Sequence, residues 1–219
     1  DFDRPYAGLL KAGISVSNFS RSDRKFKYGI DLGLIGPSSG AEAFQKWYHE
    51  FAGFPAPEGW DFQIRNEVIV DVMFEYNRQI FLLPKTIDLV TSSKLNIGTS
   101  SLNTNHSFDL RFGKLQALNR SAFKDALIGK GSTRFAGHNY FFFGYGLEYV
   151  AHNTLVEGSI WNDDSPHTED ILNWVRHWRI GWAANSETAT FKMTYYHLST
   201  EVIGAQNHAY IGLELQFFL

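Results

Sequence analysis

The chain has no cysteine, few charged residues for its length (20%) and no long apolar run. Without cysteine it has no disulfide, thiolate metal ligand or thiol nucleophile, which excludes redox chemistry. No stretch comes near the roughly 18 consecutive apolar residues of a transmembrane helix. A helical membrane anchor within these residues is therefore excluded.

A strong charge of either sign is also missing. Lysine and arginine number 20 against 23 aspartates and glutamates, the net charge is −3, and the basic residues are scattered along the chain. A nucleic-acid-binding domain carries a basic patch or stripe on one face. No nucleic-acid partner is expected.

Aromatic residues, in contrast, are abundant (16%), and they fall in long alternating runs. In residues 63–77 one face of an extended chain is mainly apolar, and the other face is mainly polar or charged. The apolar positions are Val68, Val70, Val72, Phe74 and Tyr76. The same period of two recurs in residues 26–34, 108–112, 141–149 and 189–195. This period is typical of β-strands with one apolar and one polar face.

Alternation occurs in water-soluble sandwiches as well as in membrane barrels, so strand length and aromatic placement must decide. Soluble strands are mostly about 5 or 6 residues long, whereas a tilted membrane strand needs about 9 to 11 and is flanked by aromatic girdles. Several runs here reach the longer figure. We therefore predict an all-β protein, an antiparallel outer-membrane β-barrel forming a single domain over residues 1–219.

About nine strands are expected. Their predicted ranges are 6–17, 24–36, 61–77, 86–98, 104–115, 139–150, 170–184, 187–199 and 208–219. Because bacterial barrels have even strand numbers, the odd count predicts that the barrel's first strands precede this chain. The last strand resembles the terminal signal by which barrel proteins are recognised for insertion, through Tyr210, Gly212, Leu215 and Phe217.

The polar face of a small barrel points inward, where paired charges are expected to fill the lumen. The expected members of this network are Lys11, Lys27, Asp31, Arg65, Glu67, Asp71, Glu75, Asp109, Arg111 and Glu148.

Residues 41–52 give the one convincing helix signal, and this short helix is expected outside the membrane at the barrel mouth. Ser39 and Glu42 fit a Ser-x-x-Glu capping box, and Gly53 follows the C-terminal end of the predicted helix. Gln45 and His49 share one side of the helix. The opposite side carries Phe44, Trp47, Tyr48 and Phe51. Spacing alone favours a surface or packing role for His49.

Other motifs have simple structural interpretations. Residues 36–40 fit Gly-x-Ser-x-Gly, but a nucleophile elbow needs a parallel sheet, so we interpret them as a turn and a cap. Five histidines without metal-ligand spacing are interpreted as loop or rim residues: His152, His167, His177, His197 and His208. Trp174, Trp178 and Trp182, with Ile180, suit a lipid-facing stripe.

Several of these motifs, in this order, resemble the LpxR-type lipid A deacylases. The residues that carry the resemblance are Asp3 to Gly8, Ile35 to Gly40, Gln45, His49, Gly53, Gly59, Trp60, Gln63, Asn66 and Glu67. Weaker matches at Glu201 and Gln206 extend it toward the C-terminus.

The resemblance implies a twelve-stranded outer-membrane barrel, of which this chain lacks the first three strands. It implies a calcium-dependent esterase that hydrolyses the bond holding the 3′-acyloxyacyl chain of lipid A. The family's catalytic histidine falls on His49, which would act as general base, while calcium would polarise the ester carbonyl. Gln45, Gln63 and Glu67 fall on polar family positions that would orient substrate or water.

The family's asparagine and aspartate calcium ligands, with a threonine and a lysine near the site, belong to its first three strands. A later acidic ligand would fall at Pro55, which leaves Glu58 as a weak substitute.

The partners expected are lipopolysaccharide and outer-membrane lipid. An alternative is an inactive barrel of the same family that serves as a structural or interaction subunit of an outer-membrane complex. A third reading, an outer-membrane phospholipase with a Ser-His-Asn site, lacks a serine beside a histidine-centred motif.

Overall fold

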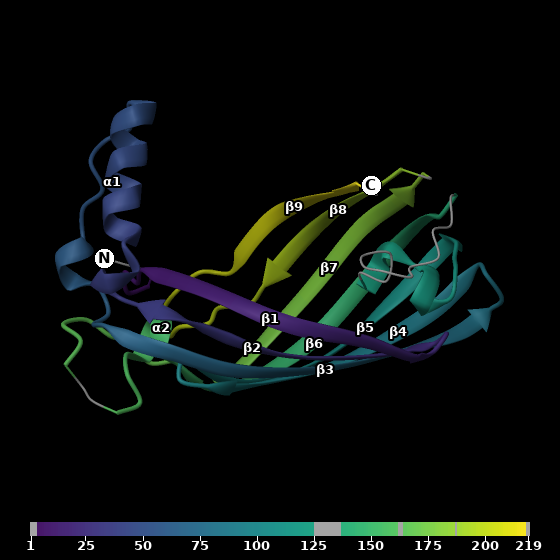
Figure 1. Cartoon of the computed structure of the whole chain (residues 1–219), viewed down its shortest axis with the longest axis horizontal. Coiled ribbons are helices and arrows are strands. Elements are labelled where there is room, and N and C mark those ends of the chain that lie inside the picture. The colour runs from purple at the N-terminus through teal and green to yellow at the C-terminus, as the bar shows by residue number, and fades with distance from the viewer. Residues whose placement is uncertain (1–3, 125–136, 162–163, 187, 218–219) are drawn as a thin grey trace.

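The computed structural model describes residues 4–124, 137–161, 164–186 and 188–217. Within these ranges nine strands form one antiparallel sheet in the order β1 to β9, each hydrogen-bonded to its neighbours in sequence, and the sheet is curled (Figure 1). The strands are β1 (Leu9–Arg21), β2 (Arg24–Ile35), β3 (Glu67–Leu83), β4 (Ile87–Gly98), β5 (Ser101–Lys114), β6 (Asn139–Asn153), β7 (Trp174–Asn185), β8 (Ala189–Leu198) and β9 (His208–Phe217). The predicted all-β fold class is confirmed.

Helices are few and short. The α-helices are α1 (Ala41–Ala52) and α2 (Thr154–Glu157), and the 3-10 turns are η1 (Pro37–Ser39), η2 (Trp60–Phe62), η3 (Leu118–Arg120) and η4 (Ala122–Lys124). Neither α-helix in the described ranges has the length and apolar character needed to cross a membrane.

The two faces of the sheet differ as the alternation predicted. In β3, Val68 and Val70 are exposed on the outer face, whereas the alternate residues Ile69 and Asp71 are buried. The same outer face carries exposed apolar side chains on every strand from β1 to β9, except that on β8 most are only partly exposed. Apolar side chains do not stay in contact with water at this density, so this face is suited to lipid.

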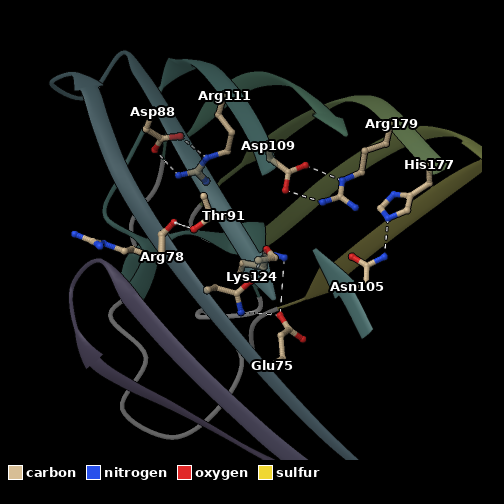
Figure 2. A network of polar contacts seen from close by, with 12 residues as sticks. Glu75, Arg78, Asp88, Thr91, Asn105, Asp109, Arg111, Lys124, His177 and Arg179 are labelled. Carbon is tan, nitrogen blue, oxygen red and sulfur yellow. Dashed lines mark hydrogen bonds and ion pairs between the residues drawn. The ribbon is translucent and has the colours of Figure 1, made fainter. Parts of the chain in front are cut away.

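Charged pairs fill the inner face (Figure 2). Arg111 on β5 makes two hydrogen bonds to the Asp88 carboxylate, at 2.8 and 2.6 Å, and neither residue has any solvent exposure. Similar bonds of 2.7 and 2.6 Å join Arg179 to Asp109. The predicted interior network is confirmed for Asp109 and Arg111, whose partners Asp88 and Arg179 were not predicted. The prediction is wrong for Arg65, which lies exposed in the loop before β3.

A segment between β5 and β6, residues 115–124, folds against the inner face near one end of the sheet. Leu115, Leu118 and Phe123 form a buried cluster with side chains of β4, β6 and β7. Gln79 fixes the segment, because its side chain donates to the Gln116 carbonyl (2.9 Å) and accepts from the Leu118 N–H (2.6 Å). We call residues 115–124 the inner segment; sequence periodicity did not predict it.

The connections at the two ends of the sheet differ in length, which orients the molecule. At one end, residues 22–23 and 84–86 make short turns. At the other end, residues 36–66, 154–173 and 199–207 make long connections. Outer-membrane barrels have short periplasmic turns and long external loops, so α1 lies at the external end. Two connections are exceptions: the long one that holds the inner segment lies at the periplasmic end, and the short one at residues 99–100 lies at the external end.

The observed limits differ from the predicted ones by four residues or more at three strands, of which the first is Leu9–Arg21 rather than 6–17. The third strand is Glu67–Leu83 rather than 61–77, since residues 60–62 form η2. The seventh begins at Trp174 rather than at 170, and before it Ile171 makes only an isolated bridge to Val202. The predicted strands 187–199 and 208–219 include residues 187, 218 and 219, which lie outside the described residues.

Candidate active site

Helix α1 begins and ends at glycines with left-handed backbone angles, Gly40 and Gly53 (φ 73° for both). The predicted helix limits and the glycine exit are confirmed. The capping box is wrong: the Ser39 hydroxyl donates to the Gly36 carbonyl (2.7 Å) and accepts only a long bond from the Ala41 N–H (3.3 Å). Glu42 accepts instead from Lys46 one turn later (2.6 Å), and this hydrogen bond raises the pKa of Lys46.

The two sides of α1 have opposite surroundings. Its four aromatic side chains are exposed, Phe51 most of all at 78%. The side with Gln45 and His49 is partly buried against residues 55–63. Figure 1 shows α1 beside the start of β1, standing clear of the strands. The aromatic side of the helix is therefore free to meet an apolar partner outside the protein.

His49 is held by its own loop. Its Nδ1 lies 2.6 Å from the Pro55 carbonyl oxygen, and the Phe54 N–H donates to the His49 carbonyl at 2.8 Å. A carbonyl oxygen only accepts, so Nδ1 must carry the proton. In the neutral ring Nε2 then holds the lone pair, which is the form that a general base requires.

Gln45, one turn before His49, is oriented by a buried tryptophan. The Trp60 indole N–H donates to Gln45 Oε1 at 2.8 Å, and the Trp60 ring packs edge-on against Tyr6, with centroids 5.3 Å apart. Since Oε1 is occupied, the amide NH₂ group of Gln45 is left to donate to another acceptor.

The other two candidate residues lie further along the same segment. Gln63 is buried and donates to Glu42 at 3.2 Å, and its Oε1 has no hydrogen-bond partner within the described residues. Glu67 begins β3 on the inner face and is partly exposed. Gln63 thus lies beside α1, whereas Glu67 makes no hydrogen bond or ion pair with His49, Gln45 or Gln63 within the described residues.

The fold brings together three of the sequence motifs. The Gly36 N–H donates to the Gly8 carbonyl (2.9 Å), and the Ile64 N–H donates to the Tyr6 carbonyl (2.8 Å). An open hollow of about 470 Å³ lies where they meet. Its lining residues are Arg4, Pro5, Tyr6, Ala7, Ala41, Gln45 and Trp60. Asp3, which the motif also includes, lies outside the described residues.

The weaker matches near the C-terminus lie close to the same region. Arg4 makes an ion pair with Glu201 at 3.2 Å, and a second hollow of about 350 Å³ is lined by Arg4, Glu201, Gln206 and neighbouring residues. The loop before β9 is therefore tied to the N-terminal motif.

Calcium in proteins is held by six to eight oxygen ligands, usually with several carboxylates. Within the described ranges no group of three histidine or acidic side chains is placed to hold a metal ion. Glu58 is exposed and belongs to no such group among the described residues. The described residues do not by themselves form a calcium site.

A curled antiparallel sheet with an apolar outer face, an ionic inner face and an external helix defines an outer-membrane β-barrel protein. A family model described as outer membrane protein LpxR matches residues 1–218, and the chain belongs to this family. The structure is similar to that of LpxR from Salmonella typhimurium, with a TM-score of 0.81 and 17% identity over 99% of this chain and 74% of that chain. Comparison with curated protein sequences gives no match.

Sequence reasoning missed three partners of the site residues: the Pro55 carbonyl, the Glu42 carboxylate and the Arg4 guanidinium. A backbone carbonyl has no sequence signal, so only the fold of residues 50–55 reveals the Pro55 contact. Glu42 was assigned to capping, and the long connection between α1 and Gln63 conceals their proximity.

Proposed function

We propose that the protein is a lipid A deacylase that hydrolyses the ester of the 3′-acyloxyacyl chain of lipopolysaccharide, with His49 as general base. The hydrogen bond from His49 Nδ1 to Pro55 carries the proposal, because it leaves the basic Nε2 free. In this mechanism Nε2 takes a proton from the water that attacks the ester carbonyl. The imidazolium then gives the proton to the departing 3′ oxygen, so the products are the free acyloxyacyl acid and a 3′ hydroxyl group on the sugar.

The surroundings of His49 suit an amphipathic substrate. The exposed aromatic side of α1 lies at the external end, where lipopolysaccharide forms the outer leaflet, and exposed aromatic side chains are typical of membrane-surface helices. The free NH₂ group of Gln45 can donate to a polar group of the substrate, and Gln63 and Glu67 can orient water. The family's calcium ion would supply a Lewis acid when bound, although the described residues show no site for it.

The test compares variants of the complete protein with purified lipopolysaccharide in detergent, by measuring the released acyloxyacyl acid. His49→Ala is expected to lower kcat by roughly 10²- to 10⁴-fold, the usual share of a positioned base. His152→Ala is the matched control, since His152 contacts Thr154 and Glu157 away from α1. Ser38→Ala is expected to retain activity, because Ser38 belongs to the η1 turn and its N–H donates to Asn66.

Each contrary outcome has a distinct meaning. If wild type releases no acyloxyacyl acid with calcium present, the protein is an inactive family member with a structural or interaction role. If Ser38→Ala alone abolishes release, a serine nucleophile replaces the histidine mechanism. A chelator distinguishes the calcium requirement, because a histidine-only reaction persists when calcium is removed.

A further inference from the structure

Three arginines form a row across the outer face at the periplasmic end of the sheet. Arg21 ends β1 and Arg24 begins β2, and the two residues are direct cross-strand partners. Arg24 is in turn the direct partner of Arg78 on β3. Like charges placed opposite each other destabilise a sheet. Three in a row therefore indicate that an anion offsets the repulsion.

The three arginines lie on the outer, lipid-facing side of the sheet. Two residues beyond Arg24 and Arg78, Phe26 faces Tyr76 across the same two strands, and both rings are exposed on the outer face. Arg24 and Arg78 have the same parity along their strands as these rings, so they point the same way. In Figure 2 the Arg78 guanidinium is directed away from the interior charges. Aromatic residues of this kind mark the level of the lipid headgroups.

The described residues provide little negative charge for the row. Arg24 Nε lies 3.7 Å from an Asp23 carboxylate oxygen, which is too long for a hydrogen bond, and no other described residue is a partner of this buried nitrogen. No described acidic group pairs with the Arg21 or Arg78 side chain. On the inner side of the same end, the η3 turn adds a further exposed arginine, Arg120, and the Asn119 N–H of this turn donates to the Ser22 carbonyl (3.1 Å).

We propose that Arg21, Arg24 and Arg78 bind the phosphate of an anionic phospholipid from the periplasmic leaflet. Guanidinium groups form paired hydrogen bonds with phosphate oxygens, which lysine cannot match. The acyl chains would lie along the apolar outer positions of β2 and β3, beginning at Phe26 and Tyr76. That apolar surface favours a diacyl phospholipid over free phosphate as the occupant. The site is at the opposite end from His49 and is independent of the proposed hydrolysis.

The probe is phosphatidylglycerol, titrated onto the complete protein in mild detergent and followed by native mass spectrometry. Wild type is expected to retain bound lipid, and each arginine replaced by glutamine is expected to weaken binding by roughly tenfold, as for a lost hydrogen bond to a charged group. Arg176→Gln is the matched control, because Arg176 is exposed on the outer face near the external end of β7. Arg78→Lys is expected to be intermediate, since it keeps the charge and loses the paired geometry.

Two further ligands test whether binding needs both the phosphate and the acyl chains. Diacylglycerol, which has the chains without phosphate, and inorganic phosphate, which has no chains, are both expected to fail to displace the phospholipid. Equal binding by wild type and by the variant in which all three arginines are glutamine overturns the proposal, as does displacement by inorganic phosphate. Heat-modifiable mobility in gels reports folding. If the triple variant is unfolded, the single variants Arg24→Gln and Arg78→Gln take its place. The proposal is then overturned if both bind the phospholipid as well as wild type does, or if inorganic phosphate displaces the phospholipid.

Discussion

Single side chains acquire their roles here from neighbours that sequence spacing does not reveal. His49 looks like an ordinary surface histidine in the sequence, yet the Pro55 carbonyl fixes which ring nitrogen is basic. Arg111 shows the same dependence in the interior, since Asp88 neutralises it while the Phe123 and Tyr140 rings lie 4.7 and 5.2 Å from the guanidinium carbon. An unpaired arginine at this position would be very costly to bury.

His138, just before β6 and outside the spanning strands, gives a pH prediction. Burial, with the positive charges of Arg111 and Lys114, lowers its pKa from 6.5 to about 4. At a pH between these two pKa values, His138 is protonated in the unfolded chain but not in the folded protein. The free energy of unfolding therefore falls as the pH drops from 6.5 to about 4. The loss is up to about 3 kcal/mol, and stability from this group is complete above pH 6.5.

Urea unfolding in detergent micelles at about pH 7.5 and about pH 4.5 measures the effect. His138→Phe is expected to lose less stability than wild type on acidification, because it has no group to titrate. Parallel losses in the two proteins would contradict the assignment to His138.

At the scale of elements, strands were predictable where one face meets lipid and the other meets polar groups. The strands at 24–36, 86–98 and 139–150 were predicted within three residues of their observed limits, because alternation continues to the strand ends. In β3 the signal is interrupted at Arg78 and Gln79. Arg78 is a charge on the lipid side, and Gln79 faces inward to hold the inner segment, so the sequence reading stopped six residues early.

The inner segment and the approach of residues 4–8 to residues 59–64 could not be predicted. Both depend on hydrogen bonds between segments far apart in the chain, such as Lys25 to the Lys124 carbonyl (2.8 Å) and the Ile64 N–H to Tyr6. Neither contact has a periodic pattern. The motif residues around α1 were recognised through family resemblance, whereas their mutual contacts required the fold.

A lipid-facing charge tests the assignment of the two faces of β3. Val70→Lys places an ammonium group on the outer face, and near mid-bilayer this costs about 2 to 4 kcal/mol. Asn103→Lys, on the inner face of β5 in a cavity that Glu148 also lines, is the matched control and is expected to cost little. Folding into phospholipid vesicles, followed by urea titration, gives both values. Equal costs would mean that Val70 does not face lipid.

At the scale of the whole molecule, the position of the candidate site depends on which end of the sheet faces the cell exterior. The long connections, α1 and the hollow beside Gln45 lie at one end, and the turns at 22–23 and 84–86 with the arginine row lie at the other. Lipopolysaccharide forms the external leaflet and phospholipid the periplasmic one. The proposed hydrolysis and the proposed phospholipid site therefore require the same orientation, although they involve no common residue.

The absence of cysteine makes this orientation directly measurable. Glu50→Cys on α1 and Thr86→Cys in the turn before β4 each introduce a single exposed thiol, one at each end. A maleimide on a polymer too large to cross the outer membrane is expected to label Glu50→Cys in intact cells. It is expected to label Thr86→Cys only after the outer membrane is permeabilised, whereas in detergent both should react equally. The reverse pattern would place His49 at the periplasmic leaflet, where there is no lipopolysaccharide to hydrolyse, and would remove the basis of the proposed activity.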